Sequence, residues 1–124
     1  MDTTAITTNT IESPKTNYYA PITKEMILDY LRELKPQLEK DGVTKLGLFG
    51  SYARDCADEN SDIDIVVNLS DEFYQKYKGF AGFAVLEKLR SGVENHFGLS
   101  TDLCNLRNCK ADKIDKFFRG AIYV

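Results

Sequence analysis

Residues 48–67 read LFGSYARDCADENSDIDIVV, and this stretch decides the expected fold. Residues 43–49, of sequence VTKLGLF, predict a strand that ends inside this stretch. Gly50 and Ser51 break that strand, because glycine followed by serine is typical of a turn. The β-branched run over residues 62–67 predicts a second strand. Two strands therefore enclose a turn, a short helical segment and a polar loop.

Helical patterns lie on both sides of these strands. Apolar residues at helical spacing predict a first helix that begins near Thr23, with its hydroxyl as the N-cap. Pro36 is expected to start a separate short turn, because proline disrupts a helix interior. A longer amphipathic helix is predicted over residues 80–97 and ends at Gly98. Its expected buried side consists of Phe80, Phe83, Leu86, Leu89, Val93 and Phe97.

The C-terminal part continues the alternation of strands and helices. Residues 99–106 predict a third strand, residues 111–119 a short helix, and residues 121–124 a terminal strand. The expected buried side of the short helix consists of Ile114, Phe117 and Phe118. Alternating helices and strands indicate an α/β or α+β fold in which helices cover a small sheet.

Length and composition predict one soluble domain. The chain has 124 residues, so residues 21–124 are expected to fold as one unit after a flexible polar tail at 1–20. The formal net charge of -3 argues against a general nucleic-acid binder, which carries a basic excess. Neither a secretion signal nor a long apolar run is visible, so a cytoplasmic location without membrane contact is expected.

Two aspartates at the start of the second strand are candidate metal ligands. Asp62 and Asp64 point to the same face of a strand, because side chains alternate along it. Adjacent carboxylates repel each other unless a cation lies between them, and their hard oxygen atoms suit Mg²⁺. A solvated strand end with two exposed aspartates is the alternative.

The turn between the strands is a candidate phosphate-binding loop. Glycine at position 50 allows a ligand to approach the backbone closely, and Ser51 lies where the short helix begins. A tight turn with an N-cap serine is the alternative for these two residues. Arg54 follows one turn later and is expected either to contact phosphate or to pair with a carboxylate.

Asp102 is a candidate third carboxylate. It lies in the predicted third strand, and it would join Asp62 and Asp64 if that strand neighbours the second one. Three carboxylates can hold two divalent ions, the arrangement used for in-line displacement at phosphorus. Asp102 could then act as the general base for the attacking hydroxyl. An exposed charge at a strand edge is the alternative.

The motif formed by residues 50–54 and 61–67 resembles the signature of the DNA polymerase β-type nucleotidyltransferase superfamily. More narrowly, residues 23–124 resemble the minimal nucleotidyltransferases (MNT), the antitoxin halves of HEPN–MNT toxin–antitoxin pairs. The resemblance implies a polymerase β-like nucleotidyltransferase fold, with a small mixed β-sheet flanked by helices. Asp55 stands where that family usually has glycine, and it adds a negative charge near the phosphate loop.

The resemblance also implies a role for each site residue. The catalytic and Mg²⁺-binding residues, for two ions, would be Asp62, Asp64 and Asp102. The residues that bind the donor substrate ATP would be Gly50, Ser51, Arg54 and Ser61.

The implied activity is transfer of AMP from ATP to a tyrosine hydroxyl of a partner HEPN ribonuclease toxin, which silences that toxin. One alternative is an antitoxin that neutralises the toxin by binding alone, which Asp55 and the absence of a further domain motivate. The other alternative is transfer to a small hydroxylated acceptor, although 124 residues leave little room for a dedicated acceptor domain.

Three aromatic residues are candidates for a partner surface, namely Tyr74, Tyr77 and Phe80. We expect them instead to pack between the sheet and the long helix, because large aromatic side chains favour burial. The two interpretations differ in the exposure they predict for each ring.

Overall fold

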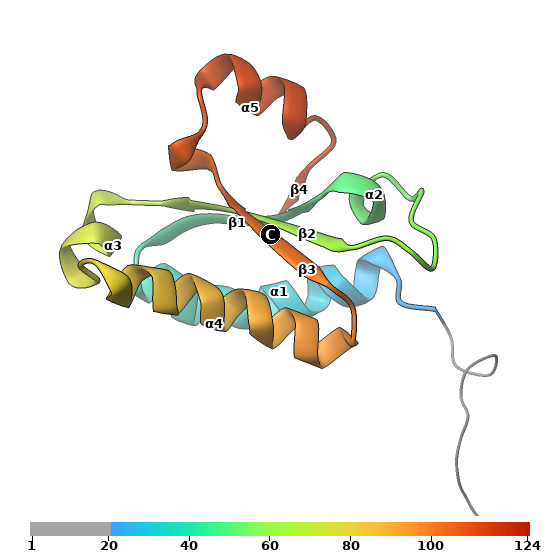
Figure 1. Ribbon diagram of the computed structural model, residues 1–124, viewed down its shortest axis with the longest axis horizontal. Coiled ribbons are helices and arrows are strands. Elements are labelled where there is room, and N and C mark those ends of the chain that lie inside the picture. The colour runs from blue at the N-terminus through green and yellow to red at the C-terminus, as the bar shows by residue number, and fades with distance from the viewer. Residues whose placement is uncertain (1–20) are drawn as a thin grey trace, which may run out of the picture.

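The computed structural model describes residues 21–124, so the predicted tail at 1–20 lies outside the described residues. A four-stranded sheet with the order β3-β2-β1-β4 forms its centre (Figure 1). Strand β1 is antiparallel to β2 and β4, whereas β2 and β3 are parallel, so the sheet is mixed as expected. The strands are β1 (Val43–Phe49), β2 (Ile63–Leu69), β3 (Thr101–Asn105) and β4 (Ile122–Tyr123).

Helices cover both faces of the sheet. Figure 1 shows α1 and α4 on one face and α5 on the other. None of the helices in the described part of the chain is long and apolar enough to span a membrane. The helices are α1 (Lys24–Lys40), α2 (Gly50–Ala53), α3 (Asp71–Lys76), α4 (Phe80–Phe97) and α5 (Ala111–Phe117), with a 3₁₀ turn at Leu106–Asn108.

Strand β2 separates two apolar clusters. Ile65 is fully buried in the larger cluster, together with the buried side chains of α1 and α4. Val66 belongs to the smaller cluster, with Leu106 and Phe118, under α5. Because side chains alternate along a strand, Asp64 shares the face of Val66 and lies on the side of α5.

Helix α1 begins as predicted but does not stop where expected. The Thr23 hydroxyl accepts a hydrogen bond of 3.2 Å from the Met26 amide, so the predicted N-cap is confirmed. The expectation that Pro36 starts a separate turn is wrong, because one helix runs through it to Lys40. Pro36 is exposed, so the hydrogen bond it cannot make is lost on the solvent side. Leu38 anchors the last turn in the core.

The start of α4 contradicts the predicted buried side. Phe80 is 90% exposed and Phe83 is 67% exposed, whereas Leu89 and Val93 are buried. The 18 residues of α4 extend about 27 Å, but the five residues of β3 extend only about 17 Å. Only residues 98–100 separate the end of α4 from the start of β3, so the first turns of the helix extend past β3.

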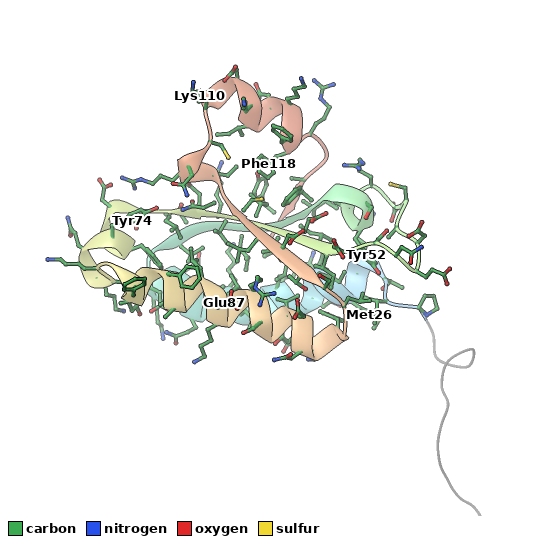
Figure 2. All side chains as sticks on the ribbon, viewed as in Figure 1. Met26, Tyr52, Tyr74, Glu87, Lys110 and Phe118 are labelled. Atoms are coloured by element: carbon green, nitrogen blue, oxygen red, sulfur yellow. The ribbon has the colours of Figure 1, made fainter. Side chains whose placement is uncertain are left out.

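Helix α5 also buries fewer aromatic rings than expected. Phe117 is 61% exposed, which corrects its predicted burial, and Phe118 is 8% exposed. Phe118 makes an edge contact with Phe49, with ring centroids 4.7 Å apart. Adjacent residues point in different directions at a helix end, so only one of the two rings reaches the sheet. Figure 2 shows Phe118 between α5 and the strands.

Candidate active site

The parallel pairing of β2 with β3 brings two predicted carboxylates together. In the register of the sheet, Asp64 lies opposite Asp102 on one side and opposite Phe49 of β1 on the other. The Ile63 amide donates a 2.9 Å hydrogen bond to the Ser100 carbonyl, which fixes the two strand starts side by side. The strand order on which the placement of Asp102 depended is therefore confirmed.

The carboxylates at the starts of β2 and β3 repel one another. The pKa of Asp64 is raised above its usual value of 3.8, first by partial burial and then by the charges of Asp102 and Asp62. Arg54 opposes this shift. Asp62 precedes β2 and is exposed, as is Asp102, so the three side chains share one open side of the sheet. A cation between them would relieve the repulsion.

The donor set fits a magnesium ion that is bound together with a nucleotide. Asp62, Asp64 and Asp102 offer the hard oxygen ligands that Mg²⁺ prefers. Within residues 21–124, no three acidic, histidine or cysteine side chains form a ready-made metal cluster. Mg²⁺ commonly takes one or two carboxylates and completes its shell with phosphate oxygens and water. The open geometry therefore matches a site that a nucleotide completes.

Gly50 is required where β1 turns into α2. Its φ of +76° lies in the left-handed region, which disfavours residues with a Cβ. A Cβ at this position would also overlap the Oδ2 atom of Asp64. The bare backbone at Gly50 is therefore what leaves room for the carboxylate.

Two predicted phosphate ligands have side chains that bind no other residue within the described range 21–124. Ser51 is half-buried at the start of α2, and Arg54 is exposed just after its end. Neither the Ser51 hydroxyl nor the Arg54 guanidinium forms a hydrogen bond or ion pair with another residue in the described range 21–124. The positive charge of Arg54 opposes the rise in the Asp64 pKa, so the guanidinium lies close enough to act on that carboxylate. Both groups can therefore serve a bound anion.

The predicted ATP ligand Ser61 stabilises the loop before β2. Its hydroxyl accepts a 2.9 Å hydrogen bond from the Asp58 amide and donates one of 3.2 Å to the Asp58 carboxylate. The Asn60 amide donates a hydrogen bond of 2.9 Å to the same carboxylate. These contacts fix the loop from which Asp62 extends, whereas a phosphate contact by Ser61 stays a prediction.

Asp55 retains the backbone conformation that a glycine would favour. Its φ is +59°, the only positive φ of a non-glycine residue among those described. Its carboxylate accepts a 2.9 Å hydrogen bond from Lys24 Nζ at the start of α1. This ion pair raises the pKa of Lys24. The negative charge of Asp55 is therefore matched by Lys24, and the pair joins α1 to the end of α2.

We expect Asp55→Gly to change the transfer rate by less than about threefold, because an exposed ion pair contributes little. Glycine relieves the left-handed backbone, which offsets the lost contact with Lys24. Asp55→Ala loses the same contact and keeps the strain of about 1 kcal/mol, so its Tm should fall below that of Asp55→Gly. Thermal unfolding and single-turnover transfer assays measure both effects. A large loss of transfer in Asp55→Gly would instead give the carboxylate a direct role.

Two positioning residues were missed by sequence reasoning. Arg90 of α4 binds Glu87 and Glu94 and donates a 3.2 Å hydrogen bond to the Thr101 carbonyl. Glu94 also accepts a 3.1 Å hydrogen bond from the Thr101 amide. These contacts hold the backbone directly before Asp102. The spacing of Arg90 and Glu94 predicts an ion pair on one helix, but not its bond to β3.

A cleft of about 450 Å³ lies beside α2, between Tyr52, Asp55, Asp58 and the start of α1. None of the three carboxylates lines it. Asp62 and Asp102 are exposed, so the carboxylates are reached from the protein surface.

Comparisons with known proteins agree with this geometry. Residues 25–123 match the family described as Nucleotidyltransferase domain. The chain is 33% identical over 106 residues to the protein adenylyltransferase MntA of Thermococcus cleftensis, covering 85% of this chain and 99% of that protein.

Solved structures share the fold. A minimal nucleotidyltransferase structure matches with a TM-score of 0.61 and 22% identity, covering 82% of this chain and 95% of that one. A toxin–antitoxin structure with AMP-PNP matches with a TM-score of 0.54 and 22% identity, covering 82% and 72%. An MntA–HpeT toxin–antitoxin complex with two aspartate-to-glutamate changes has the same TM-score of 0.54 at 20% identity and the same coverage, 82% and 72%.

Proposed function

The chain belongs to the nucleotidyltransferase domain family, and from this premise we propose that it transfers AMP from ATP to a tyrosine hydroxyl of a partner toxin. The toxin we propose is a HEPN ribonuclease, which this modification silences, so that the protein acts as its antitoxin. The observation that carries the proposal is the pairing of Asp64 with Asp102 beside the bare backbone of Gly50. The MntA relative, which is named a protein adenylyltransferase, supports it.

The proposed reaction is a displacement at the α-phosphorus of ATP. The tyrosine oxygen forms a bond to that phosphorus, and the bond from the phosphorus to the oxygen that bridges the α- and β-phosphates breaks. The leaving pyrophosphate takes the electron pair of the broken bond. Asp102 accepts the tyrosine proton, because it lies beside Asp64 on the open side of the sheet.

The metal and nucleotide ligands are proposed from the same geometry. Mg²⁺ would neutralise the negative charge of the phosphate oxygens, and we propose two ions. The residues that would hold them are Asp62, Asp64 and Asp102. The ATP phosphates would lie against the Gly50 backbone, with the Ser51 hydroxyl and Arg54 guanidinium as ligands and Ser61 at the loop.

The non-catalytic alternative loses one of its two motives. It was motivated by the absence of a further domain and by the extra charge of Asp55 near the phosphate loop, but Asp55 is paired with Lys24. No described contact directs that carboxylate toward Asp64. The Ser51 and Arg54 side chains, which form no hydrogen bond or ion pair within residues 21–124, instead favour a site that binds an anion.

Intact mass spectrometry of the protein mixed with the HEPN toxin tests the proposal. With ATP and Mg²⁺, the toxin should gain one or more adenylyl masses, and with EDTA in place of Mg²⁺ it should gain none. A toxin with phenylalanine at the modified tyrosine is the control and should gain no mass at that position. A toxin that binds but never gains mass would support neutralisation by contact alone and contradict the transfer reaction.

A further inference from the structure

The first turn of α4 exposes two large aromatic side chains. Phe80 is 90% exposed and Phe83 is 67% exposed, and their spacing of three places them on one side of the helix. Tyr74 of α3, which is 39% exposed, borders the same hollow as Phe83. We call Tyr74, Phe80 and Phe83 the aromatic patch. Neighbouring exposed aromatic rings are typical of protein interaction sites.

The surface beside these rings is hollowed. A cleft of about 400 Å³ is lined in part by Tyr74, Lys78, Phe83 and Leu86. A second hollow of about 400 Å³ is lined by Gly79, Phe80 and Phe83. The two hollows share Phe83, so apolar side chains of a partner could enter on either side of this ring.

Lys78 gives the two hollows beside the aromatic patch a positive charge. Lys78 is the charged residue among those that line the two hollows, and it forms no ion pair within residues 21–124. Helix α4 has neither an acidic residue in its first turn nor a side-chain N-cap in the described structure. The positive end of the helix dipole therefore adds to the charge of Lys78. The chain as a whole has a formal net charge of -3, so the positive charge at these hollows is opposite in sign to the net charge of the protein.

This charge favours one kind of occupant. A symmetric contact between two copies through this patch would bring two Lys78 side chains and two helix starts into one interface, and like charges repel. A different protein with carboxylates around its apolar side chains has complementary charge.

The aromatic patch is far from the carboxylates. Helix α4 separates Phe80 from the start of β3 by about 27 Å, the length of 18 helical residues. Figure 2 shows Tyr74 and Tyr52 at opposite ends of the long axis of the molecule. A partner that contacts both the patch and the carboxylates is therefore of protein size.

We propose that the aromatic patch is the docking surface for the protein that accepts the adenylyl group, and that this acceptor covers it with apolar side chains framed by carboxylates. The proposal rests on the proposed function for the identity of the acceptor. Docking at a distance from the carboxylates supplies binding energy that holds the acceptor on the protein during the reaction. The acceptor tyrosine is then held at the open site.

The test compares Phe80→Ala/Phe83→Ala with Phe117→Ala. Phe117 is the matched control, because it is 61% exposed but lies on α5, on the other side of the sheet. The probe is the purified HEPN toxin, and calorimetry measures its Kd without ATP. We expect the Kd to rise by about 30-fold or more in the double variant, the size typical of interface hot spots. Phe117→Ala should leave the Kd unchanged.

Steady-state kinetics give a second readout. In the double variant, KM for the toxin should rise in parallel with the Kd, whereas kcat at saturating toxin should stay the same. Lys78→Glu should weaken toxin binding more at low salt than at high salt, because salt screens the charge that this substitution reverses. An unchanged Tm shows that the exposed substitutions leave the fold intact.

Three results would overturn the inference. The first is a Kd that does not change in the double variant, and the second is a wild-type protein that does not bind the toxin. The third is a dimer of the free protein that the double variant dissociates, which would make the patch a contact between copies. Binding that depends on the patch without any gain in toxin mass would contradict the transfer reaction and still support docking.

Discussion

Asp64→Asn is expected to lower adenylyl transfer by about 10³-fold or more, because a metal–carboxylate contact contributes several kcal/mol to the transition state. The same substitution should raise the Tm of the nucleotide-free protein by a few degrees. Asp64 is half-buried and lies opposite Asp102 in the sheet, so its negative charge destabilises the fold. Asparagine keeps the shape and removes the charge. Single-turnover mass spectrometry and thermal unfolding measure the two effects.

The pH dependence of this stability difference follows from the sign of the pKa shift. Because the pKa of Asp64 is raised above 3.8 in the folded state, the folded protein binds this proton more tightly than the unfolded chain. Wild-type stability therefore contains a term that is lost as the pH rises from 3.8 through the raised pKa. The Tm gap between Asp64→Asn and wild type should be largest near neutral pH and should close in acid.

Two controls separate the site from general charge removal. Asp29→Asn removes an exposed carboxylate on α1, and it should leave transfer unchanged and not raise the Tm. Asp62→Asn should lower transfer as Asp64→Asn does but raise the Tm less, because Asp62 is exposed. Transfer at the wild-type rate in both aspartate variants would contradict the proposed metal site.

Gly50→Ala is expected to lower transfer by about 10²-fold or more and also to destabilise the protein, because small displacements of reacting groups cost about that much. The new Cβ would overlap the Asp64 carboxylate, so either that side chain or the turn has to move. The positive φ adds about 1–2 kcal/mol of backbone strain. Transfer kinetics and urea unfolding measure these losses.

Gly98→Ala is the matched control for this substitution. Gly98 ends α4 with a φ of +69°, and open space surrounds the position of its missing Cβ. Its replacement should therefore cost similar backbone strain and leave transfer within about threefold of wild type, because no reacting group moves. Equal losses of transfer in Gly50→Ala and Gly98→Ala would show that instability, rather than the displaced carboxylate, lowers the activity.

The elements of the fold could be predicted because their signals are local. The sequence of β1 predicted its bounds, Val43–Phe49, as the structure has them. The Thr23 cap and the stop of α4 at Gly98 also depend on a few neighbouring residues. The errors at Pro36 and Phe80 have a different origin. Whether a helix tolerates proline, or buries a ring, depends on what the rest of the molecule places beside it.

Part of the candidate site could also be predicted from neighbouring residues. Alternation along one strand predicts that Asp62 and Asp64 point the same way and that Ile65 points to the other face. The structure confirms this division, since Ile65 is fully buried and Asp64 lies on the opposite face. Glycine at position 50 predicted a close approach, but the sequence did not identify the carboxylate of Asp64 as the group that approaches.

The sequence by itself determined the order of the main strands and helices, the motif at residues 50–54 and 61–67, and the direction of its aspartates. Backbone geometry sets these features over a few residues. Only the tertiary structure decided that Asp102 lies beside Asp64. It also decided that Lys24 pairs with Asp55, which is 31 positions away. Strand order and register depend on which distant apolar surfaces bury each other, and no local pattern along one chain encodes that choice.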